Sequence, residues 1–240
     1  MTNDIHTRSL DARVPNWTPP AVPSRVVLTG RFARLEPLSA DDHADLLHDA
    51  YVGHDALWDY MPYGPFDTAS LYRNWVRETV ANPAHFFYAI RNLATGDVTG
   101  VASFLRINPH AGSIEVGHIN FAPVLQRTPA ATEAMALMMG WVFESGYRRY
   151  EWKCNALNAG SRRAAQRFGF SYEGVFRQAT VIKGRNRDTA WFAIIDSEWP
   201  RLKTAFDRWL DPENFDESGK QIARLGDLTT PVRVSSDPTL

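Results

Sequence analysis

The stretch from Ser113 to Phe121 holds the polar side chains Glu115, His118 and Asn120, of which the carboxylate and the imidazole could take part in acid–base chemistry. Apolar residues occupy positions 114 and 116 and then positions 119 and 121, so the alternation slips by one residue near His118. Since side chains in a strand alternate between faces, this slip predicts a β-bulge, a feature that often re-aims side chains beside active sites. We therefore expect the three polar residues to share one face of a bulged strand, where a carboxylate or an imidazole could accept a proton.

A short loop leads from this strand to a helix that we expect to begin at Thr128 and Pro129. Free backbone N–H groups at a helix start can hold an anion such as a phosphate. Proline is favoured at the first helical position but has no N–H, so we expect the N–H groups of residues 130–132 to do the binding. The Arg127 side chain and the Thr128 hydroxyl are further candidates for the same anion.

Two motifs stand in this region and after the next strand. The first is Gln126-Arg127-Thr128-Pro129-Ala130-Ala131 followed by Thr132-Glu133-Ala134, and the second is Asn158-x-x-Ser161-Arg162-Arg163-x-Ala165-x-x-x-Gly169-Phe170. In this order and spacing they resemble the cofactor motifs of the GCN5-related N-acetyltransferases (GNAT), and more closely those of the RimJ/RimL-like branch. The resemblance extends from about Gly30 to Leu210.

The resemblance implies an α/β (α+β three-layer) fold with a mixed, mostly antiparallel sheet that is splayed at a bulged central strand. It implies acetyl-CoA as the co-substrate and no metal. The implied reaction is direct transfer of the acetyl group to a primary amine of a small molecule, a peptide or a protein N-terminus.

The resemblance also implies catalytic roles. Glu115 matches the glutamate of RimL-like sequences and is our candidate for the general base, with His118 assisting; alternatively, Glu115 only pairs with an arginine and His118 is structural. Many GNAT members carry a tyrosine as general acid where this chain has Ala165. RimL-like members instead place a serine near the sulfur, and Ser161 matches it unless it only caps the short helix.

Asn158 resembles the family asparagine that bonds the pantetheine arm, the alternative being a turn or capping role. The basic residues Arg162, Arg163 and Arg167 either form a solvated helix face or lie near the cofactor phosphates. The candidate cofactor-binding residues are Gln126, Arg127, Thr128, Ala130, Ala131, Thr132, Asn158, Ser161 and Arg162.

Aromatic residues gather in one loop between the first two expected helices. In folds of this family that region forms a wall of the acceptor pocket, although some of the rings must simply cover the sheet. The candidate substrate-binding residues are Trp58, Tyr60, Tyr63 and Phe66. The polar turn from Lys183 to Asp188 either borders the same cleft or is solvated.

Composition restricts the function classes. The chain has 240 residues, 44% of them apolar and 22% charged, with a net charge of −1, so overall charge gives no reason to expect a nucleic-acid partner. No apolar run approaches the ~20 residues of a membrane span, and the N-terminal stretch lacks the apolar core of a signal peptide. Cys154 is the single cysteine. We expect a cytoplasmic protein without a membrane partner, as a monomer or a homodimer.

We expect an extended or partly disordered N-terminal arm over residues 1–24, the GNAT acetyltransferase domain over residues 25–210, and a polar, loosely attached C-terminal tail over residues 211–240. Strands are expected at about 31–38, 86–90, 98–107, 113–121, 150–155, 170–182 and 188–195. Helices are expected at about 40–51, 68–80, 129–145 and 161–167, with a last one from 198 onward; the expected N-caps include Ser39, Thr128 and Ser197.

Two other functions are compatible with these residues. The first is a catalytically silent GNAT-like domain that binds CoA or a regulatory ligand, an interpretation that Ala165 and Pro129 keep open. The second is an acyltransferase that uses another acyl donor or an oxygen acceptor.

Overall fold

The computed structural model describes residues 13–240, so the first half of the expected N-terminal arm lies outside the described residues. From residue 13 onward the arm is extended and contacts the body. The indole N–H of Trp17 donates to the carbonyl of His110 at 3.2 Å, and the hydroxyl of Tyr147 donates to the carbonyl of Ala21 at 3.0 Å. Within the described residues, none of the helices combines the length and the apolar character needed to span a membrane.

The secondary structure follows the expected order. The strands are β1 (Leu28–Thr29), β2 (Ala33–Pro37), β3 (His85–Asn92), β4 (Val98–Asn108), β5 (Ser113–Phe121), β6 (Arg149–Asn155), β7 (Ser171–Ile182) and β8 (Arg185–Ile195). The α-helices are α1 (Ala40–Tyr51), α2 (Ala69–Ala81), α3 (Pro129–Glu144), α4 (Ala159–Arg167), α5 (Trp199–Trp209) and α6 (Leu225–Thr229). Short 3₁₀ turns lie at Asp55–Trp58 and Pro212–Asn214.

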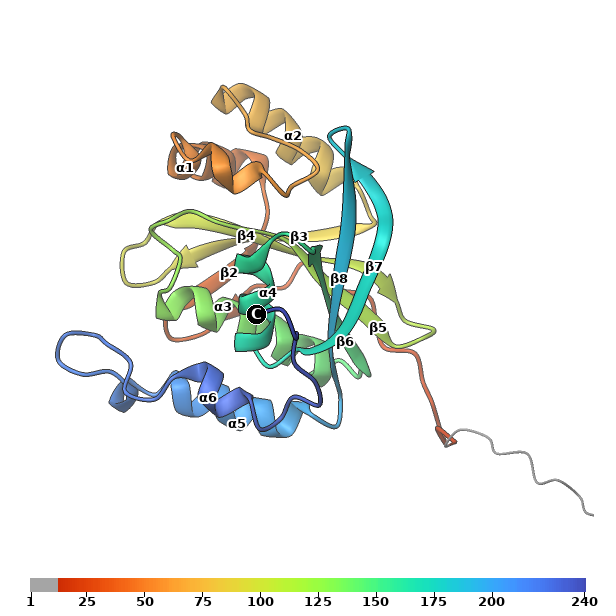
Figure 1. The fold of residues 1–240 in the computed structure, drawn as a ribbon. Helices are drawn as coiled ribbons and strands as arrows, with labels where there is room; N and C mark the ends of the chain where they lie inside the picture. The colour runs from red at the N-terminus through yellow and green to blue at the C-terminus, as the bar shows by residue number, and fades with distance from the viewer. Residues whose placement is uncertain (1–12) are drawn as a thin grey trace, which may run out of the picture.

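The eight strands form one sheet in the order β1-β2-β3-β4-β5-β6-β8-β7. All neighbours pair antiparallel except β5 and β6, which run parallel. Helices α1 and α2 cover one face and α3, α5 and α6 the other (Figure 1). The expected three-layer α/β fold with a mostly antiparallel sheet is therefore confirmed.

Each face of the sheet carries its own core. Helix α3 is buried around most of its circumference, with Met135 and Met138 fully enclosed, because it packs between the sheet and α5. The smaller core lies under α1 and α2 and is rich in aromatic rings, among them Trp58 and Tyr72. Burial on both faces fixes the strand register, since a shift by one residue would exchange the two sets of side chains.

Most of the expected helix starts are confirmed. The hydroxyls of Ser39 and Thr128 accept backbone N–H groups of the first turn, at 3.3 and 3.1 Å. The expected cap at Ser197 is wrong: α5 begins one residue later than expected, at Trp199, and Glu198 stands at the cap position without a capping hydrogen bond from its side chain. The Glu198 carboxylate instead accepts the N–H of Ile195 at 2.9 Å. Helix α4 begins two residues earlier than expected, with Asn158 as its cap.

Glu133 ties α3 to the start of β2. Its buried carboxylate accepts the backbone N–H groups of Arg31, Phe32 and Ala33 at 2.5 to 2.8 Å. Gly30 stands directly before this turn, and a Cβ at that position would collide with the carboxylate. The three N–H groups precede a strand and have few other partners, so the carboxylate satisfies donors that would otherwise be buried unpaired.

The C-terminal segment is packed onto the domain, so the expectation that it is loosely attached is wrong. Leu225 and Val232 are buried in the larger core. Asp237 is 4% exposed, and its carboxylate accepts the Nε–H of Arg162 on α4 at 2.7 Å. A few well-spaced apolar residues and one buried ion pair suffice to fix an otherwise polar stretch.

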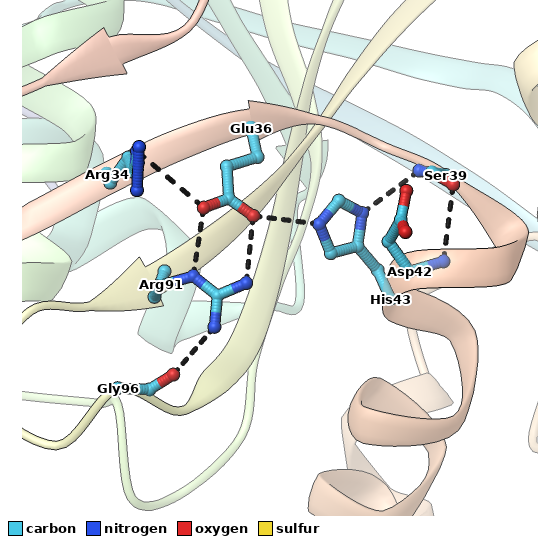
Figure 2. A network of polar contacts seen from close by, with 7 residues as sticks. All are labelled: Arg34, Glu36, Ser39, Asp42, His43, Arg91 and Gly96. Atoms are coloured by element: carbon cyan, nitrogen blue, oxygen red, sulfur yellow. Dashed lines mark hydrogen bonds and ion pairs between the residues drawn. The ribbon is translucent and has the colours of Figure 1, made fainter.

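A polar network joins β2, β3 and the start of α1 (Figure 2). The Glu36 carboxylate accepts two hydrogen bonds from Arg91, both at 2.9 Å, and contacts His43 Nε2 at 2.9 Å. The backbone N–H of Ser39 donates to His43 Nδ1, which leaves the ring proton on Nε2 to donate to Glu36. The hydrogen bond from Arg91, with that from His43, outweighs burial and lowers the pKa of Glu36 to about 2.

Removing this carboxylate should therefore destabilise the fold in a pH-dependent way. A carboxyl group whose pKa is lowered on folding stabilises the native state above its unfolded value of 4.5, and this contribution disappears as the pH falls toward 2. We expect Glu36→Gln to lower the free energy of unfolding by about 1–3 kcal/mol at pH 7 and by much less near pH 3. Urea unfolding across this range measures the difference.

The matched control is Glu78→Gln, because Glu78 is exposed on α2. It should change the free energy of unfolding by less than about 0.5 kcal/mol at every pH. A deficit of Glu36→Gln that stays constant from pH 7 to pH 3 would contradict this explanation.

Candidate functional site

A cleft of about 620 Å³ opens where β5 and β6 separate. The two strands pair only as far as Val116 and Trp152, whereas β5 continues to pair with β4 up to Phe121. One edge of β5 therefore has no strand partner beyond Val116. Of the predicted site residues, those that line the cleft are Glu115, His118, Asn158, Ser161 and Tyr60.

The bulge in β5 is confirmed. Gly117 pairs with Ser103 and Asn120 pairs with Val101, so two residues of β5 stand opposite one residue of β4. His118 has a φ of 51°, a left-handed conformation that is uncommon outside glycine. Because of this extra residue, Glu115, His118 and Asn120 lie on the α1/α2 side, while the apolar residues on both sides of the bulge pack toward α3. Asn120 lies under α1 and outside the cleft.

Glu115 is a buried carboxylate between two cations. Only 2% of the residue is exposed, and its oxygens lie 2.6 Å from Arg106 and 2.9 Å from Lys153. Lys153 is shared with Glu151 at 2.8 Å. Burial raises the pKa of Glu115, and Arg106 and Lys153 offset part of that rise. Glu115 does pair with an arginine, as the alternative to a catalytic role expected. It also lines the cleft, and its pKa is shifted toward neutrality, as a general base needs.

His118 is held by an aromatic neighbour. Its Nδ1 lies 2.9 Å from the Tyr63 hydroxyl, and the two rings stack with an interplanar angle of 17°. Burial, together with repulsion from His85 and Arg106, lowers the pKa of His118 to about 4. The imidazole is therefore neutral at neutral pH and is a weak proton acceptor.

The start of α3 offers fewer free N–H groups than expected. The N–H of Ala131 donates to the Thr128 hydroxyl at 3.1 Å, and the N–H of Thr132 donates to the Thr128 carbonyl at 3.3 Å. Pro129 stands at the first helical position and has no N–H. Within the described chain, the N–H groups that remain without a partner in this turn are those of Arg127 and Ala130.

The loop before α3 has a defined shape. The Gln126 side-chain amide donates to the carbonyl of Phe121 at 2.9 Å, which holds the loop against the end of β5. Arg127 adopts a φ of 63° and is exposed, and its guanidinium makes no side-chain hydrogen bond or ion pair to any described residue. The structure thus leaves one flexible cation next to the free N–H groups of the helix start.

On α4, the capping role belongs to Asn158. Its Oδ1 accepts the N–H of Ser161 at 3.0 Å, so the alternative in which Ser161 caps this helix is wrong. The Ser161 hydroxyl accepts the indole N–H of Trp152 at 3.0 Å and lies beside the Cys154 thiol, whose pKa burial raises. Since the indole N–H uses an oxygen lone pair of Ser161, the hydroxyl proton stays available for donation into the cleft.

Arg162 points away from the cleft. Its guanidinium donates to Asp237, to the carbonyl of Ala156 at 2.9 Å and to Thr239. These contacts fasten the C-terminal segment to α4. A contact between Arg162 and a cofactor phosphate would require some of them to break.

The aromatic loop divides into two groups. Tyr60 lines the cleft, and its hydroxyl donates to the carbonyl of Leu157 at 3.3 Å, across the entrance between the loop and α4. Trp58 is 3% exposed and packs edge-on against Phe66 with 5.3 Å between ring centroids. Neither of these rings lines the cleft, and the same holds for Tyr63, against which they pack. Tyr63 contacts the cleft lining through His118.

The tip of the β7–β8 hairpin closes over this loop. The Lys183 ammonium donates to the carbonyls of Trp58 and Gly64 at 2.9 and 2.7 Å. The hairpin therefore rises from the sheet to the α1/α2 layer, as Figure 1 shows. Of the two interpretations of the polar turn, the one in which it borders the cleft is supported, because Arg187 lies in the cleft wall.

Several lining residues were not identified from the sequence as site residues. They are Arg106, Lys153, Thr189 and Trp191, with Phe176 and Thr180 on the edge strand. One signal was present for Lys153, which follows the apolar Trp152 in an alternating strand and so had to face away from α3. The other residues come from β4, β7 and β8 and reach the cleft only because of the order of the strands in the sheet, which the sequence pattern did not show.

Comparison with known proteins identifies related chains. Residues 33–171 match the family model of the acetyltransferase (GNAT) domain. The chain is similar to the crystal structure of a GCN5-related N-acetyltransferase from Brucella melitensis, with 45% identity and a TM-score of 0.88 over 90% of this chain and 100% of that one. A probable acetyltransferase of the GNAT family from Chromobacterium violaceum has 37% identity and a TM-score of 0.76, over 80% and 98% of the two chains.

A more distant similarity shows the fold alone. The acetyl transferase of Salmonella typhimurium that modifies the N-terminal serine of ribosomal protein L7/L12 has 21% identity and a TM-score of 0.62, over 71% of this chain and 99% of that one. The search of curated proteins found no match.

Proposed function

We propose that this chain, which belongs to the GCN5-related N-acetyltransferases, is an acetyl-CoA-dependent enzyme. The acetyl group passes directly to a primary amine inside the cleft between β5 and β6. The observation that carries the proposal is the cleft itself. It passes through the sheet where the parallel strands separate, so Ser161 and Asn158 from one side and Glu115 and His118 from the other border one space. Its volume of about 620 Å³ is in the range of small-molecule sites.

The residues at the start of α3 fit an anionic cofactor. The unpaired N–H groups of Arg127 and Ala130, with the positive end of the helix dipole and the exposed Arg127 side chain, form a site for a diphosphate. Bound there, acetyl-CoA supplies a thioester whose carbonyl carbon an amine can attack. The unpaired edge of β5 beyond Val116 offers backbone donors that polarise a carbonyl oxygen.

Within the cleft, Glu115 accepts the proton of the attacking amine, directly or through a water molecule. Its raised pKa supports this role better than the lowered pKa of His118 supports proton acceptance by the imidazole. His118 then acts by holding Tyr63 in place. Ser161 donates its hydroxyl proton in a hydrogen bond to the departing sulfur, since a serine can stabilise a thiolate without titrating.

We place the chain in the RimJ/RimL-like branch, with amines of small molecules, peptides or protein N-termini as acceptors. Two residues support this assignment: Ser161 lines the cleft, and the usual tyrosine position holds Ala165, whose methyl group has no proton to donate. A cytoplasmic location and a monomeric or dimeric state remain predictions of the sequence.

One observation favours a second candidate, a catalytically silent GNAT-like domain that binds CoA or a regulatory ligand. Pro129 and the capping bonds of Thr128 leave few N–H groups at the helix start. Incubation with acetyl-CoA, longer acyl-CoAs, amines and alcohols, followed by measurement of released thiol, tests the proposal. Release that depends on an amine supports acetyl transfer; release only with an alcohol or only with a longer acyl-CoA supports the other acyltransferase.

The cofactor site predicts a thermal shift. Acetyl-CoA should raise the melting temperature by mass action. Arg127→Asn removes the charge but keeps a residue that tolerates a positive φ, so the fold should be retained. Loss of one charge-assisted phosphate contact should weaken the binding of acetyl-CoA by roughly 10-fold. The control Arg208→Gln, on the exposed face of α5, should leave the binding unchanged. No shift at millimolar acetyl-CoA would contradict the cofactor site.

The general base is tested by a pair of isosteric changes. Glu115→Gln should lower turnover by about 10²-fold or more, because it removes proton acceptance, while acetyl-CoA binding stays nearly constant. Glu151→Gln is the matched control, since Glu151 shares the same Lys153 partner but does not line the cleft. It should lower turnover by less than about threefold. Equal losses in both variants would mean that the ion-pair network, and not proton acceptance, is responsible.

The sulfur donor is tested at Ser161. Ser161→Ala should slow transfer by roughly 10- to 100-fold, the effect of losing one hydrogen bond to a developing charge. Trp152→Phe removes the same indole–serine hydrogen bond but keeps the hydroxyl, so it should slow transfer much less. Single-turnover kinetics with saturating acetyl-CoA measures both. Full activity of Ser161→Ala would show that the thiolate leaves without this donor.

A further inference from the structure

Arg187 is a cation in the cleft wall without a partner among residues 13–240. It lies on β8 and is half-buried with its Nε fully enclosed, yet none of its guanidinium nitrogens forms a hydrogen bond or an ion pair with any residue in the described part of the chain. Burial lowers the pKa of Arg187, the Cys154 thiol and the Glu115 carboxylate offset part of this effect, and repulsion from Arg106 adds to it. Buried guanidinium groups are normally paired, because an unpaired one loses its hydration without compensation.

The cleft has an excess of positive charge around this residue. The charged side chains that line it are Arg106, Lys153, Arg187 and Glu115. Glu115 pairs with Arg106 and Lys153, and Glu151 also pairs with Lys153, so the two carboxylates balance these two cations. Among the described residues, neither carboxylate forms an ion pair with Arg187. His118 does not alter this balance, since its pKa of about 4 keeps it neutral.

A second unpaired donor lies on the same strand. Trp191 is four residues after Arg187, so the two side chains lie on the same face of β8, and its buried indole N–H also has no partner among the described residues. Lys153 stacks on the Trp191 ring with its ammonium 3.8 Å from the ring centroid. Among the described residues of β8 that line the cleft, Arg187 is thus the charged donor and none carries a negative charge, while the Trp191 indole N–H is enclosed within the wall.

We infer that this wall binds a carboxylate on the acceptor, so that the substrate is a small amine that carries a carboxylate near its amino group, such as an amino acid or a short peptide. Arg187 is then a specificity-determining residue. This inference rests on the proposed acetyl transfer, because it assigns the acceptor of that same cleft.

The phosphates of acetyl-CoA are a less suitable partner for Arg187. Residues 190 and 192 of β8 face the core under α3, so Arg187 and Trp191 face the opposite side of the sheet, which carries α1 and α2. The free N–H groups for a diphosphate lie at the start of α3. An anion from the acceptor is therefore the ligand that reaches Arg187 from the α1/α2 side.

The experiment compares acceptors that differ only in the carboxylate. Amino acids and dipeptides are offered as free acids and as C-terminal amides, and released thiol is followed with saturating acetyl-CoA. The dipeptide pairs matter most, since amidation at the far end hardly changes the basicity of the amine. We expect kcat/KM to be about 10- to 100-fold higher for the acids, the effect of one charge-assisted contact.

Variants assign that preference to Arg187. Arg187→Gln should raise the KM for the acids about 10- to 100-fold with little change in kcat, and should leave the amides nearly unaffected. Arg187→Lys should retain part of the preference. Arg185→Gln is the matched control, because Arg185 lies on the same strand but is exposed and does not line the cleft; it should change neither value.

The outcomes separate the inference from the function on which it rests. Equal kcat/KM for acids and amides in the unmodified protein overturns the inference and leaves acetyl transfer intact, as does preferential transfer to long peptides with amidated ends. If Arg187→Gln does not fold, the Arg187→Lys variant and the comparison of acids with amides still test whether the cleft binds a carboxylate. Absence of thiol release with every amine overturns the proposed function instead, and the acceptor assignment with it.

Discussion

The separation of β5 from β6 is the constraint on which the rest of the molecule depends. A parallel pair is held together for four residues and then ends at Val116 and Trp152, in the middle of an otherwise continuous sheet. The strand β5 can leave its neighbour because β4 still satisfies its other edge, and because the bulge at His118 changes its direction. The residues on the two faces of this sheet belong to two separate cores.

Where β5 and β6 separate, side chains from the middle of the sheet line the cleft, and several of them are charged. Glu115 is buried on the face away from α3, where Arg106 and Lys153 compensate its charge. The excess of cations in the same space disfavours the protonated form of an entering amine, so it works in the same direction as a general base. A carboxylate on the acceptor would reduce this repulsion while the amine is bound.

The sequence predicted those features whose cause is local. The slip in the apolar pattern predicted the bulge, and the hydroxyls of Ser39 and Thr128 predicted two helix starts, because each involves residues at most a few positions apart. The cap at Ser197 failed because the helix begins after Glu198, and none of the described side chains caps its first turn.

Features that depend on strand order could not be predicted in this way. Arg187 reaches the cleft because β8 lies between β6 and β7, an arrangement that no local pattern encodes. Arg162 was assigned to the cofactor, but its partner Asp237 lies 75 residues away in a segment with few apolar residues. The sequence shows that both residues are charged. It does not show that Arg162 pairs with Asp237, or that Arg187 has no partner among the described residues.

The carboxylate of Glu133 has a consequence for how this sequence can diverge. It holds the turn before β2 through three N–H groups, and it occupies the space that any side chain at position 30 would need. Neither residue can be exchanged alone without losing the turn or creating a collision. Over evolutionary time, positions 30 and 133 should therefore change together or not at all, although more than a hundred residues of chain lie between them.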